Sequence, residues 1–221
     1  MTPAGEVAAG ILEDGDVRIV TVGPMGPYGN NAYIVRDTSA RAGLLVDMPL
    51  EEGRLLAAIA AEGGVQTVIA THWHHDHWMT YDAVRRATGA PVLVGAEEVN
   101  VPEARIDGRL QDGRELLVGG VRVVVLHTPG HTPGSISLRV GWAVITGDTL
   151  FHGGPGKTFA RGDLEVILAS IDAKLLPLPD MTVVLPGHGG STTVGRARSG
   201  REAYRRHPRA AGFHGDVEWG S

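Results

Sequence analysis

The first half of the chain alternates short apolar runs with glycine, proline and aspartate, a pattern typical of β-strands joined by tight turns. Two amphipathic stretches interrupt this pattern and predict helices. Pro49 opens the first, which runs to about Glu62 and ends at a glycine pair. The second lies near Tyr81–Thr88. The predicted strands of this half are Val17–Val22, Asn31–Val35, Gly43–Asp47, Val65–Ala70 and Pro91–Val94.

The second half repeats this organisation, with several strands followed by a helix over Asp163–Leu175. No long linker or low-complexity segment separates the halves, so we expect one domain over residues 1–221. Two sheets packed face to face, with helices outside them, are the natural layering for this pattern and place the chain in the α/β (α+β) class. The predicted strands of this half are Arg114–Val118, Val121–His127, Ser135–Val140, Trp142–Thr146 and Thr182–Leu185.

Residues 196–221 form an arginine-rich C-terminal extension that we expect to begin as a helix. It holds Tyr204, Phe213, His214 and Trp219, more apolar anchors than a disordered tail needs. One hypothesis is therefore a lid packed near the entrance of the site. The favoured alternative is a surface helix with a loose end or a dimer contact, because chain termini are often poorly ordered. The sequence leaves the oligomeric state open, a homodimer included.

Composition excludes several classes of protein. Hydrophobic residues make up 43% of the chain, which is ordinary for a globular domain. The net charge of -5 argues against a nucleic-acid partner, and no apolar run reaches the length of a membrane span. Cysteine is absent, which excludes disulfides, thiolate ligands and a cysteine nucleophile. The N-terminal residues lack the positive region of a secretory signal, so we expect a cytoplasmic protein with no membrane partner.

The strongest chemical signal is the segment His72-Trp73-His74-His75-Asp76-His77, directly after a predicted strand. In an extended segment the first two of its histidines, His72 and His74, project to the same side. Where the chain turns toward the next helix, Asp76 and His77 can face a second point nearby. So dense a cluster is hard to explain as surface histidines or helix caps. The segment therefore predicts ligands for two neighbouring metal ions.

Three later turns carry one further candidate ligand each, at or near the end of a predicted strand. The turns are TPGHTPGS with His131, TGDT with Asp148 and PGHGG with His188. Loops at strand ends are where a rigid scaffold presents functional groups. Each turn alone is a weak signal, but three of them in order after the histidine cluster are a strong one.

Imidazole and carboxylate ligands suit zinc, iron or manganese. Seven candidate ligands fit two divalent ions with open positions, and zinc is the favoured metal. Two ions about 3.5–4 Å apart share a hydroxide, a nucleophile at neutral pH, and polarise the bond that it attacks. Asp76 could orient this hydroxide while it ligates.

The remaining histidines and tryptophans in these segments carry weaker signals. We expect a packing or supporting role for His75, which points away from His72 and His74 if the segment is extended. Either His127 or His152 could line the pocket, but structural roles are favoured for both. Core packing or a pocket wall explains Trp73 and Trp78 equally well.

These motifs, HWHHDH, PGHTPGS, TGDT and PGHGG, resemble the metal-binding motifs of the metallo-β-lactamase superfamily over more than half of the chain. The resemblance implies an αββα sandwich with the site at one edge of the sheets. It also implies how the ligands divide. One metal is held by His72, His74 and His131, the other by Asp76, His77 and His188, and Asp148 bridges the two.

Within the superfamily, the stretches 147–163 and 168–195 resemble glyoxalase II, the hydroxyacylglutathione hydrolases. The resemblance implies thioester hydrolysis and an anionic thioester as substrate. Lys157 matches a basic residue that helps that group bind glutathione carboxylates, and Phe159 stands where a tyrosine is usual. Full-size members continue into a helical domain, whereas few residues follow His188 here. The chain therefore resembles the short, single-domain members, which puts glutathione specificity in doubt.

Other functions stay open. A persulfide dioxygenase has the same fold, uses one iron and needs only a subset of these ligands. The same hydroxide would serve a lactonase equally well. A β-lactamase, a nuclease and a non-catalytic binding protein are less favoured. One large group of β-lactamases needs a cysteine ligand, nucleases need basic surfaces, and a protein without activity would be expected to have lost a ligand.

Overall fold

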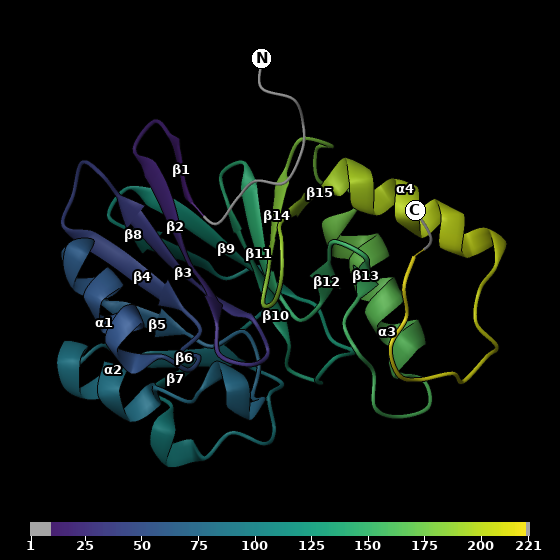
Figure 1. The fold of residues 1–221 in the computed structure, drawn as a ribbon, viewed down its shortest axis with the longest axis horizontal. Coiled ribbons are helices and arrows are strands. Elements are labelled where there is room, and N and C mark those ends of the chain that lie inside the picture. Colours follow the sequence, from purple (N-terminus) through teal and green to yellow (C-terminus); the bar gives the residue numbers. More distant parts are fainter. Residues whose placement is uncertain (1–9, 220–221) are drawn as a thin grey trace.

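The computed structural model describes residues 10–219 and consists of two sheets packed face to face between two layers of helices (Figure 1). The first sheet has seven strands in the order β1-β2-β3-β4-β5-β6-β7. The second has six in the order β15-β14-β11-β10-β9-β8, and β12 pairs with β13 beside it. The αββα sandwich expected from the sequence is confirmed.

The strands are short, and most begin or end at a turn that contains glycine. The first sheet is formed by β1 (Ile11–Asp14), β2 (Val17–Met25), β3 (Asn30–Asp37), β4 (Ala42–Val46), β5 (Thr67–Ile69), β6 (Val92–Gly95) and β7 (Gly108–Leu110). The second sheet is formed by β8 (Glu115–Val118), β9 (Val121–His127), β10 (Ile136–Val140), β11 (Ala143–Gly147), β14 (Val183–Pro186) and β15 (Thr192–Thr193). The additional pair is β12 (Leu150–Phe151) and β13 (Gly154–Pro155).

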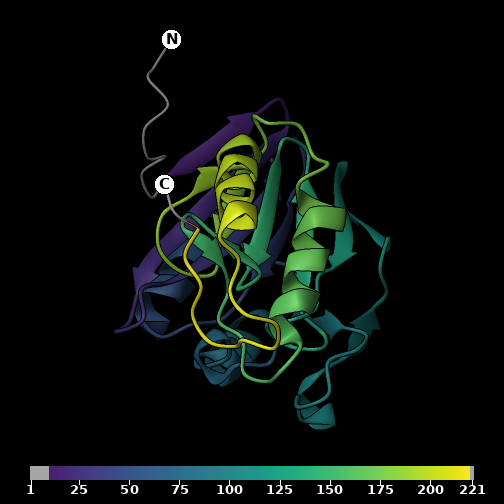
Figure 2. The same cartoon turned by 90° about the vertical axis from the view of Figure 1, so that its right-hand side faces the viewer.

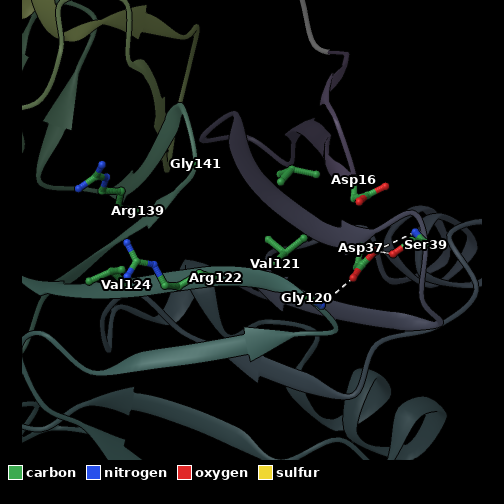
Figure 3. Close-up of a pocket in the computed structure, with 10 residues that line it drawn as sticks. Asp16, Asp37, Ser39, Gly120, Val121, Arg122, Val124, Arg139 and Gly141 are labelled. Carbon is green, nitrogen blue, oxygen red and sulfur yellow. Dashed lines mark hydrogen bonds between the residues drawn. The ribbon is translucent and has the colours of Figure 1, made fainter.

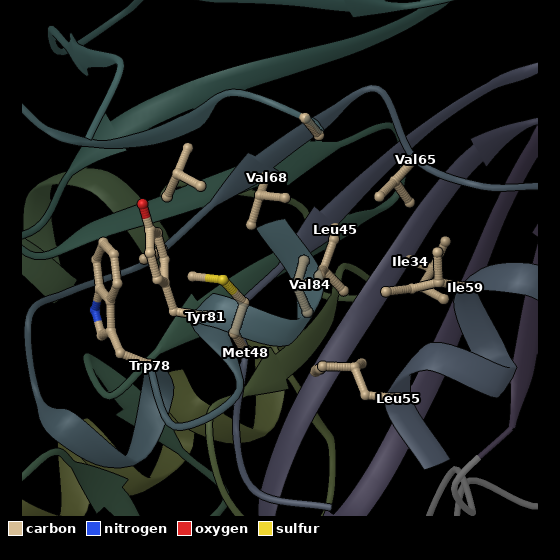
Figure 4. Packing of buried hydrophobic residues seen from close by; sticks show 14 of the residues in the cluster. Ile34, Leu45, Met48, Leu55, Ile59, Val65, Val68, Trp78, Tyr81 and Val84 are labelled. Atoms are coloured by element: carbon tan, nitrogen blue, oxygen red, sulfur yellow. The ribbon is translucent and has the colours of Figure 1, made fainter. Parts of the chain in front are cut away.

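Alternation along each strand divides the buried side chains between the layers. In β4, Leu44 and Val46 join the core between the two sheets, whereas Leu45 joins the core under the helices. That outer core holds α1 (Glu52–Ala61) and α2 (Tyr81–Thr88) against the first sheet (Figure 4). A third core holds α3 (Asp163–Ser170), which continues as a π-helical turn to Leu175, and α4 (Val194–Arg206) against the second sheet (Figure 2).

The predicted elements exist, with differences at their ends. The first helix begins at Glu52 and not at Pro49, because Glu51 adopts a left-handed backbone with φ of 72° that an α-helix cannot contain. The tail helix begins at Val194, two residues before the predicted start, where Thr193 accepts a hydrogen bond from the Arg196 N–H. The strands β1, β7, β12, β13 and β15 were not predicted, since runs of two to four residues are too short to show a clear period.

Among the described residues, no helix combines the length and the apolar character needed to cross a bilayer.

Candidate metal centre

Strands from both sheets end at one edge of the sandwich, and the turns that follow them carry the candidate ligands. The segment with the histidine cluster follows β5 of the first sheet, while the other three turns follow β9, β11 and β14 of the second. An isolated bridge between Asn30 and His188 joins the two sheets at this edge. These turns bring together His72, His131, Asp148 and His188.

His72, His74 and His131 turn their ring nitrogens toward one another. His74 Nδ1 lies 3.1 Å from His72 Nε2 and 2.8 Å from His131 Nε2. His131 Nδ1 donates to the carbonyl oxygen of Lys157 at 2.7 Å, so a neutral ring carries its lone pair on Nε2, facing the group. The expectation that His72 and His74 face the same side is confirmed by these distances.

Asp76 and His77 lie in a short 3-10 turn over His75–His77 and face His188. The Asp76 Oδ2 atom is 3.3 Å from His188 Nε2 and 3.6 Å from His77 Nε2, and the two ring nitrogens are 3.3 Å apart. His188 Nδ1 donates to the Tyr28 carbonyl oxygen at 2.9 Å, which leaves Nε2 directed at the group.

Asp148 lies between the two groups and contacts both. Its Oδ2 atom is 3.5 Å from His131 Nε2 and 3.3 Å from His188 Nε2, and its Oδ1 atom is 3.4 Å from His77 Nε2. All seven residues that the sequence singled out therefore meet in one place. Their ligand atoms form three clusters, each within 4.8 Å: His72, His74 and His131; His72, His77 and Asp148; Asp76, His77 and His188.

Asp47 supports this arrangement, and the sequence reasoning missed it. Its buried carboxylate accepts hydrogen bonds from the Thr71 N–H at 2.8 Å, from the Thr71 hydroxyl at 2.9 Å and from His77 Nδ1 at 2.9 Å. Donation from Nδ1 leaves the Nε2 lone pair of a neutral His77 facing the cluster. The available signal was a carboxylate at the end of a predicted strand, at the same sheet edge as the histidine segment.

Two more buried polar residues hold the ligand segments in place. Asn30 donates from Nδ2 to Asp76 Oδ2 at 2.9 Å. Glu98 accepts from the Thr132 hydroxyl at 2.7 Å, and therefore ties the turn that carries His131 to the loop after β6. Neither residue belongs to a motif, so the sequence gave no signal for them.

The histidines of the first group and His188 of the second have pKa values shifted in opposite directions. Burial lowers the pKa of His72 and of His131, and lowers that of His74 to about 4 with help from the neighbouring His131. Burial alone would also lower the pKa of His188, but hydrogen bonds to Asp148 and Asp76 raise it to about 10. In the metal-free chain the three histidines of the first group are therefore neutral.

Asp148 and His77 depend on each other's charge. Burial alone would raise the pKa of Asp148, but the neighbouring His77 holds it well below its usual range. Burial alone would lower the pKa of His77, but the carboxylates of Asp47 and Asp148 raise it well above 6.5. The buried carboxylates of Asp47 and Asp148 thus favour a positive charge beside them, which the protonated His77 ring supplies in the metal-free chain.

The residues present fit divalent metal ions. The Asp148 Oδ1 atom is buried and accepts no hydrogen bond from the described residues, which leaves a carboxylate lone pair for a cation. A Cβ on Gly187 would meet that oxygen at 2.2 Å and His77 Cε1 at 2.9 Å, so the backbone is packed closely around the ligand atoms. Imidazole nitrogens and carboxylate oxygens are the ligands that zinc, iron and manganese accept.

The other residues named from the cluster segment lie around it. His75 is exposed and lines a small apolar hollow with Trp73 and Trp78, away from the ligand atoms. The Trp78 Nε1–H donates to the His72 carbonyl oxygen at 2.7 Å, which fixes the backbone of this candidate ligand. The ring centroid of Trp73 lies 4.7 Å from that of His74.

Two further histidines lie outside the clusters of ligand atoms. His127 pairs its ring with the Pro133 carbonyl oxygen at 2.9 Å. His152 is exposed beside α4.

Lys157 and Phe159 lie next to the first histidine group. The Phe159 ring centroid is 5.3 Å from that of His74, and the ring is 53% exposed. The Lys157 ammonium lies 3.5 Å from a carboxylate oxygen of Asp216 in the C-terminal tail. The lysine contacts the site through its backbone carbonyl, which holds His131.

The C-terminal tail returns to this loop after α4. The Trp219 N–H donates to the Gly153 carbonyl oxygen at 2.7 Å, and Gly215 exchanges hydrogen bonds with Thr158. Val217 and Trp219 are buried in the core under α3 and α4. The tail is therefore packed as far as Trp219, while its role as a lid stays a prediction.

Two hollows in the surface differ in their distance from the candidate ligands. One, of about 1020 Å³, begins at His74 and His131 and runs outward between the loop after β6 and α3. The other, of about 400 Å³, is lined by Asp37, Arg122 and Arg139 among others and lies where β3, β8 and β10 turn into the next strand, at the end of the sandwich opposite the ligands (Figure 3). Only the first can receive a substrate of this site.

A family model for the metallo-β-lactamase superfamily matches residues 25–188. The chain belongs to that superfamily. It is 36% identical over 194 residues to a probable metallo-hydrolase, YqgX, of Bacillus subtilis, covering 77% of this chain and 90% of that protein. It is 32% identical over 197 residues to the hydroxyacylglutathione hydrolase GloC of Haemophilus influenzae, covering 79% and 92%. These relatives share nearly their whole length with the chain.

Solved structures agree on the fold and differ in their names. The crystal structure of the B3 metallo-β-lactamase BLEG-1 matches with a TM-score of 0.72 and 30% identity, over 80% of this chain and 95% of that one. The crystal structure of ETHE1 from Myxococcus xanthus matches with a TM-score of 0.68 and 31% identity, over 91% and 84%. The chain is thus a member of a superfamily of metal-dependent hydrolases whose members differ in substrate.

Proposed function

We propose that this protein is a dinuclear metal-dependent thioester hydrolase of the hydroxyacylglutathione hydrolase type, with zinc as the favoured metal, in the cytoplasm. The observation that carries the proposal is the full set of seven ligand residues around one point. Its 32% identity to a hydroxyacylglutathione hydrolase over most of both chains favours thioesters among the possible substrates. Iron or manganese would suit the same donors.

Each side chain has a defined part in this proposal. His72, His74 and His131 would hold one ion and Asp76, His77 and His188 the other, with Asp148 between them. Two such ions supply an activated water and polarise the substrate carbonyl. Asp76 is 24% exposed, so its carboxylate can accept a hydrogen bond from a water at the mouth of the site and orient it. Asn30 fixes that carboxylate from behind.

Metal content and substrate preference test the proposal together. Elemental analysis of gently purified protein should give two equivalents of metal per chain. S-lactoylglutathione should be hydrolysed with a higher kcat/KM than a β-lactam, a lactone or a phosphodiester. A single iron with no second equivalent would instead favour a persulfide dioxygenase, whose ligand set is a subset of this one.

Asp76 provides the matched test of the site. Asp76→Ala should abolish most hydrolysis with little effect on the far-UV circular dichroism, because the residue is partly exposed and outside the cores. Asp82→Ala, an exposed aspartate on the neighbouring helix α2, is the control and should leave activity unchanged. Equal activity of the two variants would contradict the role of Asp76.

Lys157 would bind an anionic group on the thiol carrier. Its ion pair with Asp216 has to open for this, and both side chains are exposed enough to do so. Lys157→Ala should raise KM for S-lactoylglutathione roughly five- to thirty-fold with little change in kcat, the cost of one partly exposed charge pair. Lys174→Ala is the control, since the other lysine of the chain pairs with Asp112 and does not line the hollow that begins at His74 and His131. An unchanged KM in Lys157→Ala would make it an ordinary surface residue.

A further inference from the structure

The hollow that starts at the first histidine group has an apolar wall, built from three segments that are distant in the sequence. Trp73 comes from the ligand segment, Val99 from the loop after β6, and Phe159 and Val166 from the loop before α3 and from α3 itself. Val99 is 68% exposed, Phe159 53% and Val166 44%. Large apolar side chains gathered and left uncovered beside a site mark a place where an apolar partner is received.

The charges around this hollow also select its occupant. Glu97 and Asp163 are its charged lining residues, and within residues 10–219 no lysine or arginine lines it. Asp163 accepts hydrogen bonds from the backbone N–H groups of Ala160 and Phe159, so its carboxylate has a structural use there. Two carboxylates without a basic partner repel an anionic group that enters the hollow.

We infer that this hollow binds the acyl group of the substrate and that the preferred acyl group is an uncharged apolar chain, longer than lactoyl. The inference rests on the proposed thioester hydrolysis and narrows its substrate class. Its inner wall contains His74 and His131, so a chain lying in it places the thioester carbonyl at the ligand cluster. A volume of about 1020 Å³ holds far more than a three-carbon acyl group.

The acyl arm fits this place better than the thiol arm does. Biological thiol carriers are polar and charged, and the apolar wall and the two carboxylates disfavour them here. Lys157 does not line the hollow, and its exposed ammonium, paired with Asp216, is the positive charge that the proposed function assigns to a carrier carboxylate. The two arms of the substrate would therefore leave the cluster in different directions, the acyl chain along Val99 and Val166 and the carrier toward Lys157.

A chain-length series on one small neutral thiol tests the assignment. Butanoyl and octanoyl thioesters of N-acetylcysteamine differ by four methylenes, and each buried methylene changes binding by roughly fourfold. Because the hollow is open to water on one side, we expect a rise of at least about tenfold in kcat/KM from butanoyl to octanoyl. An acyl chain of the octanoyl length that ends in a carboxylate should lose this advantage.

Binding measured apart from catalysis separates the two proposals. Ketone analogues, in which a methylene replaces the thioester sulfur, are titrated calorimetrically into the metal-loaded protein. Tighter binding of the octyl than of the butyl analogue, with no thioester hydrolysed, would leave the apolar subsite standing and refute the proposed function. Hydrolysis with equal binding of both analogues would overturn the subsite and leave the function standing.

Substitutions locate the preference in the hollow. Val99→Ser and Val166→Ser should each reduce the octanoyl-to-butanoyl ratio several-fold, because the longer chain loses more apolar contact with the altered wall. Leu117→Ser, at another exposed apolar residue, lies on β8 away from the site and should not alter the ratio. An unaltered ratio in both valine variants would refute the assignment. The assignment would also be refuted if the two valine variants dissociated a dimer and still bound the ketone analogues, since a second copy of the chain would then occupy the hollow.

Discussion

Replacing Asp47 by asparagine would remove one buried charge beside the ligand cluster and leave the backbone undisturbed. Asp47 has a φ of 65°, a left-handed conformation that asparagine adopts as readily as aspartate. The asparagine side-chain oxygen can still accept from the Thr71 N–H, as Asp47 Oδ1 does at 2.8 Å. What it cannot reproduce is the negative oxygen, Oδ2, that His77 Nδ1 and the Thr71 hydroxyl each contact at 2.9 Å.

The size of the effect on the second metal equivalent follows from the contact with His77. A hydrogen bond to a charged group contributes about 1.5–3 kcal/mol, and the His77 ring is fully buried, so water cannot replace the partner. At 1.4 kcal/mol for each factor of ten, the second metal equivalent should bind roughly ten- to hundred-fold more weakly. The same loss would lower the Tm of the metal-free chain by about 3–12 °C, given the length of the chain.

Chelator competition measures the affinity for each metal equivalent, and circular dichroism on heating gives the Tm. The first equivalent should lose less affinity than the second, because Asp47 reaches the group of His72, His74 and His131 only through the Thr71 hydroxyl, which lies 3.1 Å from His72 Nδ1. Asp82→Asn, at an exposed position, controls for the loss of charge. If the second equivalent binds Asp47→Asn with wild-type affinity, the orientation of His77 does not depend on this carboxylate and the reasoning fails.

Two further predictions concern stability. Trp219→Ala should lower the free energy of unfolding by about 3–5 kcal/mol in a denaturant titration, because the indole is buried in the core under α3 and α4. Trp219→Phe should recover much of this loss. An unchanged denaturation midpoint in the alanine variant would mean that the tail does not contribute to the stability of the fold. Asp37 accepts hydrogen bonds from the Ser39 hydroxyl and from the N–H groups of Gly120 and Ser39, and these lower its pKa below 3.8 (Figure 3). The Asp37 carboxylate therefore stabilises the fold fully above the ordinary aspartate pKa of 3.8, and this stabilisation is lost as the pH falls through its lowered pKa. Asp37→Asn should consequently have a lower Tm than the wild type at pH 7. A difference in Tm that did not shrink below about pH 4 would contradict this.

The sequence by itself determined the layers and singled out the candidate ligands. Alternation in β3 and β4 assigns each side chain to one face of a sheet, and this local property needs no knowledge of the partner strand. Histidine and aspartate in turns after strands are also local signals. They could be recognised because metal ligation restricts the residue types and because each turn lies at the end of a rigid element. The start of α1 was wrong because the left-handed backbone of Glu51 depends on contacts with the loop at Gly26, to which its side chain is hydrogen-bonded.

Only the tertiary structure decided which residues meet those ligands from outside the motifs. Asp47, Asn30 and Glu98 are ordinary polar residues in the sequence, and they act because strand pairing carries them to the edge where the ligand turns lie. The apolar hollow likewise exists only in the folded structure. Val99 and Phe159 are sixty residues apart and share a wall because both loops end at that edge. Such contacts depend on distances across the fold, and a pattern along the chain carries no record of them.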